Sequence, residues 1–243
     1  MAQLWPGLGG PSINYISGAP SESWQQTWPR SVVLLGSTGS IGRSTLAVAA
    51  AHPQAFRIMG LACARNVQRL AEQALEWRPP HLAVLDDESA AKLRTLLPAD
   101  YRPRILVGSN GYAELASLPE ASTVLSAQVG AAGLAGTLAA ALAGKVICLA
   151  NKESLVLAGD LVRRVCARTG AVVLPVDSEH NAIFQCLAGR SGAAHSHGFG
   201  RALPWLEPRS PERGDHRAGP QSPQLEHGCQ DHHRLGHAHE QGA

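Results

Sequence analysis

Short apolar runs alternate with amphipathic segments between residues 31 and 187. Seven of the runs have the length and the Val, Ile and Leu content of buried strands: 32–36, 57–63, 81–85, 104–107, 122–126, 145–150 and 171–176. Five intervening segments have the length and composition of crossover helices: 44–51, 67–77, 88–97, 131–142 and 160–168. This alternation predicts an α/β fold built on a Rossmann-like, doubly wound parallel sheet.

The segments that flank this region lack the alternation. Residues 1–30 contain Trp5, Trp24 and Trp28 among Pro, Gly and Ser, without the basic start and apolar core of a signal peptide. Residues 188–243 show no apolar periodicity and hold eight of the eleven histidines, whose spacing matches no standard metal site. We expect a disordered extension at 1–30 and a disordered tail at 188–243.

Charge and cysteine content narrow the class of protein. The 243 residues carry 21 Lys and Arg against 19 Asp and Glu, so no strong basic field argues for nucleic acid or an anionic membrane as a partner. The longest apolar stretches are far shorter than the roughly 20 residues of a membrane helix. Five cysteines without CxxC spacing are typical of core residues in a reducing compartment. We expect a cytoplasmic protein that binds neither a membrane nor nucleic acid.

A glycine-rich loop follows the first strand. Residues 36–42 read Gly-Ser-Thr-Gly-Ser-Ile-Gly and open a helical segment. Glycines allow a tight turn and a close approach of the backbone to a pyrophosphate, whose charge a helix N-terminus stabilises. Ser37, Thr38 and Ser40 add hydroxyl donors. The glycine spacing differs from the commoner G-x-G-x-x-G, so the loop indicates dinucleotide binding without excluding a purely structural turn.

A cationic loop follows the second strand, where a dinucleotide-binding fold places the residue that meets the adenosine ribose. Ala64, Arg65 and Asn66 occupy this position, with no acidic residue among them. A guanidinium pairs with a 2′-phosphate that a carboxylate would repel, so the loop favours NADPH over NADH. The alternative is that Arg65 is a solvated loop cation.

Two polar loops follow the last two predicted strands. Asp177 and Glu179 lie two apart in a turn and can offer hard oxygen ligands to a divalent cation. Lys152 and Ser178 are available to a phosphorylated or hydroxylated substrate. The alternative is a helix start, with Ser178 as the cap and both carboxylates favouring the helix dipole. Spacing alone leaves both interpretations open.

Together these loops resemble one enzyme family. Residues 36–42, 150–155 and 175–187 are similar, in order and separation, to 1-deoxy-D-xylulose 5-phosphate reductoisomerases, and the resemblance covers residues 31–187. It implies an NADPH-binding domain at 31–176, the start of an α+β catalytic domain with a Mg²⁺ or Mn²⁺ site at 177–187, and a homodimer in intact members. The implied reaction is the isomerisation and reduction of 1-deoxy-D-xylulose 5-phosphate to 2-C-methyl-D-erythritol 4-phosphate in isoprenoid biosynthesis.

The resemblance also implies a role for each loop residue. The cofactor would contact Thr38, Gly39, Ser40, Ile41, Ala64, Arg65, Asn66, Asn151 and Glu153. Lys152 would contact the substrate and, with Glu179, take part in catalysis. Ser178 and Glu179 would touch the substrate, and Asp177 and Glu179 would be metal ligands.

The amino-acid sequence of the tail does not resemble the family. A coding sequence for the tail, read in the frame one nucleotide later, can encode the family's strings. Intact members continue with Ser-Gly-Gly-Pro-Phe, His-Pro-Asn-Trp-Ser-Met, Lys-Ile-Thr-Ile-Asp-Ser-Ala-Thr and Met-Asn-Lys-Gly strings and a metal-binding glutamate. Codons exist for 197–205, 222–227, 230–237 and 239–242 that encode the four strings, in this order, when read one base later. We hypothesise a single frameshift between about residues 187 and 195, which makes 188–243 an out-of-frame tail and truncates the catalytic domain. We therefore expect little or no turnover; the alternative is a stand-alone NADPH-binding or sensor module with a His-rich tail.

Resequencing the coding DNA from codon 180 to well past codon 243 tests the frameshift. We expect the Ser-Gly-Gly-Pro-Phe and Asn-Trp-Ser-Met codons in the shifted frame. If those nucleotides are absent, the frameshift hypothesis is wrong and the tail is a segment in its own right.

Overall fold

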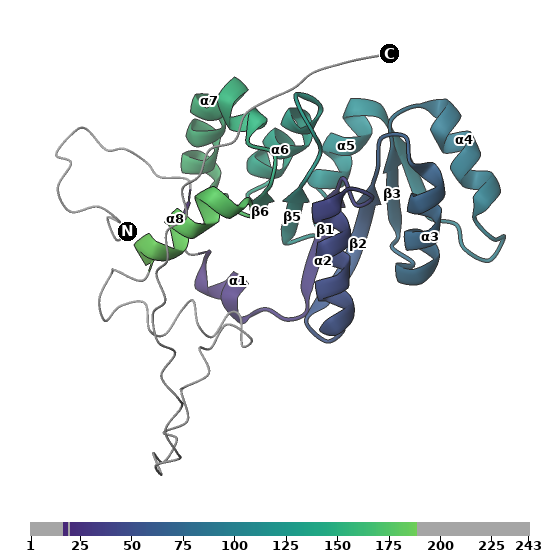
Figure 1. Cartoon of the computed structure of the whole chain (residues 1–243), viewed down its shortest axis with the longest axis horizontal. Helices are drawn as coiled ribbons and strands as arrows, with labels where there is room; N and C mark the ends of the chain where they lie inside the picture. The colour runs from purple at the N-terminus through teal and green to yellow at the C-terminus, as the bar shows by residue number, and fades with distance from the viewer. Residues whose placement is uncertain (1–16, 19, 189–243) are drawn as a thin grey trace, which may run out of the picture. The chain divides into compact units, whose positions relative to one another are not determined.

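A seven-stranded parallel sheet is the centre of the structure, a computed structural model that describes residues 17, 18 and 20–188 (Figure 1). The strands are β1 (Arg30–Leu35), β2 (Phe56–Ala62), β3 (His81–Val84), β4 (Arg104–Val107), β5 (Thr123–Ser126), β6 (Val146–Leu149) and β7 (Val172–Pro175). All seven predicted strands are confirmed, with ends that agree within two residues. The doubly wound α/β prediction is therefore confirmed.

The order of the strands reverses at the middle of the sheet. From β1 the chain builds outward through β2, β3 and β4, and then returns to the other side of β1 for β5, β6 and β7, giving the order β4-β3-β2-β1-β5-β6-β7. In open α/β sheets the connections diverge at such a reversal, here between β1 and β5, and this leaves room for a ligand beyond the carboxyl ends of the two strands. This is the position at which open α/β sheets bind ligands.

Helices cover both faces of the sheet (Figure 1). They are α2 (Ser40–Ala51), α3 (Val67–Trp77), α4 (Asp87–Leu96), α5 (Gly108–Ala116), α6 (Ala132–Leu142) and α7 (Glu153–Thr169), with α8 (Ser178–Ala188) after β7. On β1, Val32 and Leu34 join the core under α2, α3 and α4, while Val33 and Leu35 join the core under α5, α6 and α7. Side chains of a strand alternate between faces, so β1 contributes to both cores.

Among the helices that connect the strands, three differ from the sequence prediction. The pattern does not predict α5, because Gly108 and Gly111 are poor helix formers; Tyr112 and Leu115 nevertheless bury their side chains in the core. Helix α7 begins seven residues before the predicted segment, since a kink at Ala158 (φ −144°, ψ 28°) separates its first turn from the part with clear periodicity. Helix α2 begins at residue 40 rather than 44 and so includes the last three residues of the glycine-rich loop.

The segment before β1 is not without structure, contrary to the expectation for residues 1–30. Helix α1 (Glu22–Gln26) is capped by Ser21, and Trp24 Nε1 donates to Thr123 Oγ1 at 3.1 Å, at the start of β5. Arg30 is buried, and its guanidinium stacks on Trp24 and Trp28 at 3.8 and 4.1 Å from the ring centroids. It also donates to the Gln25 carbonyl at 2.7 Å. These contacts hold residues 20–30 against the amino ends of the strands.

Part of the sequence prediction lies outside the described residues. Residues 1–16 of the expected extension and 189–243 of the expected tail are not described. Within the described ranges, no helix has both the length and the apolar character needed to cross a membrane. The described residues of the two expected domains belong to one unit, in which α8 packs against β7.

Replacing Arg30 tests the contacts before β1. Arg30→Ala removes two carbonyl bonds and the stacking on two indoles, and we expect the free energy of unfolding to fall by about 2–4 kcal/mol. Arg57→Ala, at an exposed position of β2, is the control and should change it by less than about 0.5 kcal/mol. Urea denaturation measures both. Equal effects would show that Arg30 contributes no more than a surface cation.

Candidate functional site

Four loops at the carboxyl ends of the strands carry the residues singled out from the sequence. They follow β1, β2, β6 and β7, and they hold or border Thr38, Gly39, Ser40, Ile41, Ala64, Arg65, Asn66, Asn151, Lys152, Glu153, Asp177, Ser178 and Glu179. All seven strands are parallel, so these loops emerge at one edge of the sheet. The topology therefore gathers the predicted residues on the side where such sheets bind ligands.

The glycine-rich loop is built for close approach of its backbone to neighbouring groups. Gly36 has φ +90°, and a Cβ there would lie 2.6 Å from the Ala127 carbonyl oxygen, so no larger residue fits. A Cβ on Gly42 would lie 2.6 Å from the Ser37 carbonyl oxygen. Gly39 is the N-cap of α2 and supplies no side-chain cap bond. The first backbone N–H groups of α2 therefore have no intrahelical or cap partner and can receive a phosphate.

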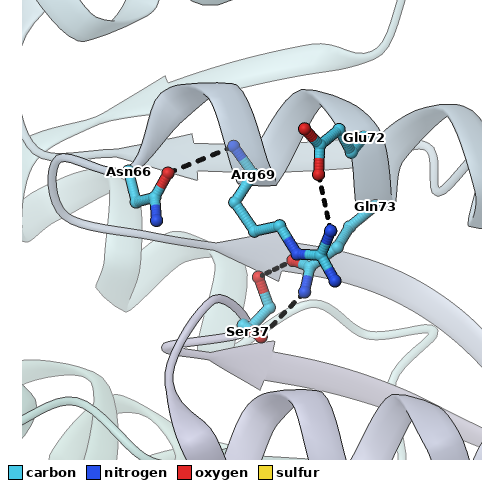
Figure 2. A network of polar contacts seen from close by, with 5 residues as sticks. All are labelled: Ser37, Asn66, Arg69, Glu72 and Gln73. Atoms are coloured by element: carbon cyan, nitrogen blue, oxygen red, sulfur yellow. Dashed lines mark hydrogen bonds and ion pairs between the residues drawn. The ribbon is translucent and has the colours of Figure 1, made fainter.

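Ser37 does not serve as a phosphate donor, contrary to the sequence interpretation. Its side chain is fully buried, and its Oγ donates to Gln73 Oε1 at 2.8 Å (Figure 2). Gln73 Nε2 donates back to the Ser37 carbonyl at 3.0 Å. This reciprocal pair ties the loop to α3, and Thr38 and Ser40 remain the hydroxyls on the outer side of the loop.

The three residues of the loop after β2 are all exposed, and one of them, Asn66, caps a helix. Asn66 Oδ1 accepts from the Arg69 backbone N–H at 3.2 Å and caps α3, as Figure 2 shows. Ala64 and Arg65 are exposed. Sequence reasoning missed one residue near this loop, Asp86. It lies two residues after the end of β3, the strand that pairs with β2. The neighbouring positions of β2 and β3 in the sheet could not be known from the sequence.

The Asn151 side chain links the loops that follow β5 and β6. It is 2% exposed, and its Nδ2 donates to the carbonyls of Gln128 and Gly130, the latter at 2.9 Å. Its Oδ1 accepts from the backbone N–H and the Oγ of Ser154, at 2.8 and 2.6 Å. Both ends of the amide are occupied by protein groups. Asn151 therefore joins the loops after β5 and β6, while Lys152 and Glu153 beside it are exposed.

The last loop begins a helix and presents two carboxylates. The His180 backbone N–H donates to Asp177 Oδ1 at 2.9 Å, so Asp177, and not Ser178, occupies the position of the cap of α8. This bond is the main cause that lowers the pKa of Asp177; the His180 ring, 2.6 Å from the same oxygen, lowers it further, and partial burial opposes both. The lowered pKa favours the ionised form, which metal binding requires.

The donor set at this loop suits a hard divalent cation. Carboxylate oxygens are the protein ligands that Mg²⁺ and Mn²⁺ prefer, and one or two of them are enough when substrate and water complete the coordination. Glu179 and Ser178 are exposed, and Asp177 is half-buried. In the part of the chain that the structure describes, no group of three or more His, Cys, Asp or Glu side chains is arranged to hold a metal.

Comparisons with known proteins agree on one family. Residues 32–159 match the family model of 1-deoxy-D-xylulose 5-phosphate reductoisomerase. The reductoisomerase of Nitratidesulfovibrio vulgaris (strain DP4) is 66% identical over 182 residues, which are 75% of this chain and 45% of that protein. The chain thus spans less than half the length of this relative.

Solved structures give the same result. A crystal structure of DOX-P reductoisomerase in complex with NADPH, fosmidomycin and magnesium is similar with a TM-score of 0.61 and 48% identity, over 65% of this chain and 38% of that one. The reductoisomerase from Zymomonas mobilis in complex with NADPH has a TM-score of 0.62 and 40% identity, over 65% of this chain and 41% of that one.

Gly42 provides a test of the packing of the loop. Gly42→Ala places a Cβ against backbone atoms of Ser37, and we expect the free energy of unfolding to fall by about 1–3 kcal/mol. Gly39→Ala is the matched control, because its Cβ would meet its nearest atom, the Gly36 oxygen, at 3.4 Å; we expect a loss below about 1 kcal/mol. Thermal and urea unfolding compare the two. A Gly42→Ala variant as stable as the control would contradict the packing described here.

Proposed function

Because the chain belongs to the 1-deoxy-D-xylulose 5-phosphate reductoisomerase family, we propose that residues 31–176 bind NADPH across the carboxyl ends of β1 and β5. The observation that carries this proposal is the loop 36–42, which lies at the point where the strand order reverses and presents the open N-terminus of α2. Gly36 and Gly42 leave no room for a side chain inside the loop, so its backbone is held in the compact form that a pyrophosphate needs.

The surrounding residues divide the binding of NADPH between them. Thr38, Gly39, Ser40 and Ile41 line the outer side of the loop and would bind the phosphates. Arg65 would pair with the 2′-phosphate at the adenosine end, where Ala64 leaves room and Asn66 fixes the start of α3. Glu153 would lie at the cofactor, and Asn151 would act by holding the loops that border it.

The loops after β6 and β7 would receive the substrate and a metal. Lys152 is exposed and can bind an anionic or hydroxylated substrate, and Ser178 can donate to it. Asp177 and Glu179 would hold Mg²⁺ or Mn²⁺. When bound, the cation stabilises negative charge on substrate oxygens and NADPH supplies hydride. Asp177 also keeps the start of α8 in place, which orients Ser178 and Glu179.

We propose that this chain retains the NADPH-binding part of the reductoisomerase and has lost its catalytic activity. The reaction of an intact member, conversion of 1-deoxy-D-xylulose 5-phosphate to 2-C-methyl-D-erythritol 4-phosphate, also needs the strings that lie out of frame in 188–243 under the frameshift hypothesis. The nucleotide loops all precede that segment. Binding of NADPH without turnover is thus the expected behaviour, and the homodimer of intact members would need the restored frame.

Nucleotide titration of the full chain tests this proposal. NADPH should bind more tightly than NADH, and Arg65→Gln should weaken NADPH binding about tenfold, because one charge-assisted bond to the 2′-phosphate is lost. Arg69→Gln is the control, since Arg69 pairs with Glu72 at 2.6 Å one turn further along α3; it should change binding less than about twofold.

Turnover is measured on the same preparations. NADPH oxidation with 1-deoxy-D-xylulose 5-phosphate and Mg²⁺ should be undetectable for the chain as written and should be restored by a coding sequence returned to the other frame. A chain that binds neither nucleotide contradicts the cofactor proposal, and turnover by the chain as written contradicts the proposed loss of activity.

A further inference from the structure

The pairing of β2 with β3 brings a carboxylate opposite Arg65. The two strands run parallel with Gly60 facing His81 and Ala62 facing Ala83. Two hydrogen bonds carry the pairing beyond the strands: Cys63 N–H to the Ala83 carbonyl at 3.1 Å, and Leu85 N–H to the Ala64 carbonyl at 3.4 Å. Continued by one more residue, the same register places Asp86 opposite Arg65.

The carboxylate of Asp86 is held in place from its own side. Asp86 is the N-cap of α4, and its Oδ1 accepts from the Ser89 backbone N–H at 2.8 Å. The pKa of Asp86 lies below its usual value, mainly through its hydrogen bonds to Ser89 and to a lesser degree through the positive charge of Arg65. Asp86 therefore stays ionised at neutral pH and interacts electrostatically with the Arg65 guanidinium.

Arg65 is available to a carboxylate or a phosphate. It is exposed, and in the described part of the chain no carboxylate forms an ion pair with it within 4.0 Å. Its side chain can thus turn toward Asp86 or toward a phosphate bound at the carboxyl end of β2. The fixed Asp86 carboxylate and a bound phosphate would both attract the Arg65 guanidinium.

We propose that Asp86 is a specificity-determining residue of the nucleotide site, whose carboxylate competes with the 2′-phosphate of the ligand for the Arg65 guanidinium. The inference rests on the proposed NADPH site and adds a residue that opposes its selectivity. Asp86 weakens binding of 2′-phosphorylated nucleotides and leaves unphosphorylated ones unaffected. The ratio of NADPH to NADH affinity is accordingly lower than Arg65 alone would give.

Asp86→Asn is the variant that tests this role, because Asn caps a helix as well as Asp does and removes only the charge. We expect NADPH to bind about threefold to tenfold more tightly and NADH to bind as before. Asp87→Asn is the matched control: it removes the same charge from the next residue, which lies in the first turn of α4 and outside the register with Arg65. Fluorescence titration with NADPH and NADH gives both affinities, and thermal unfolding confirms that each variant is folded.

A double variant separates competition for Arg65 from simple repulsion of the ligand. In an Arg65→Gln background, Asp86→Asn should no longer raise NADPH affinity. An undiminished gain in that background overturns the competition, as does an Asp86→Asn variant that binds like Asp87→Asn. If the wild-type chain prefers NADPH, the proposed cofactor site stands and these results decide only the role of Asp86. If the wild-type chain binds neither nucleotide, the proposed cofactor site itself is overturned.

Discussion

Strand β1 is hydrogen-bonded on both edges and buried on both faces, and the described structure is organised around it. It pairs with β2 on one side and β5 on the other, and Val33, Leu34 and Leu35 are fully buried. A buried strand must satisfy every backbone group through its neighbours, so β2 and β5 are fixed relative to it. The glycine-rich loop leaves directly from this strand. Its position at the reversal of the strand order is thus a consequence of the most constrained part of the sheet.

The elements of the sheet were predictable because their signal is local. Buried parallel strands read as short runs of Val, Ile and Leu, and each such run became a strand. Helix α5 was not predictable, because its glycines carry no helical signal and its formation depends on burial of Tyr112 and Leu115. A helix start at α8 was one of two interpretations that the sequence left open, with Ser178 as the cap; the cap is Asp177, since both residue types are good caps and tertiary structure decides between them.

The positions of the site loops were also predictable, whereas the orientation of their side chains was not. A loop that follows a parallel strand emerges at the carboxyl edge whatever its neighbours are, and this places Thr38, Arg65 and Glu179 correctly. Ser37 turns inward because Gln73, from a helix 36 residues away, offers it a buried partner. The position of Asp86 opposite Arg65 likewise depends on the adjacency of β2 and β3. Long-range partners of this kind leave no periodic trace in a single sequence.

The indole rings of the described residues are concentrated at the edge of the sheet that faces away from the nucleotide loops. Trp24 reaches the start of β5, Trp28 lies edge-on to Phe56 at the start of β2, and Trp77 ends α3 shortly before β3. Intrinsic tryptophan emission from these rings therefore reports on the amino edge of the sheet, while the emission of a reduced nicotinamide would report on the carboxyl edge. Trp5 and Trp205, which lie outside the described residues, add to the total emission, so a chain with both replaced by Phe would let the amino edge be observed independently of the carboxyl edge.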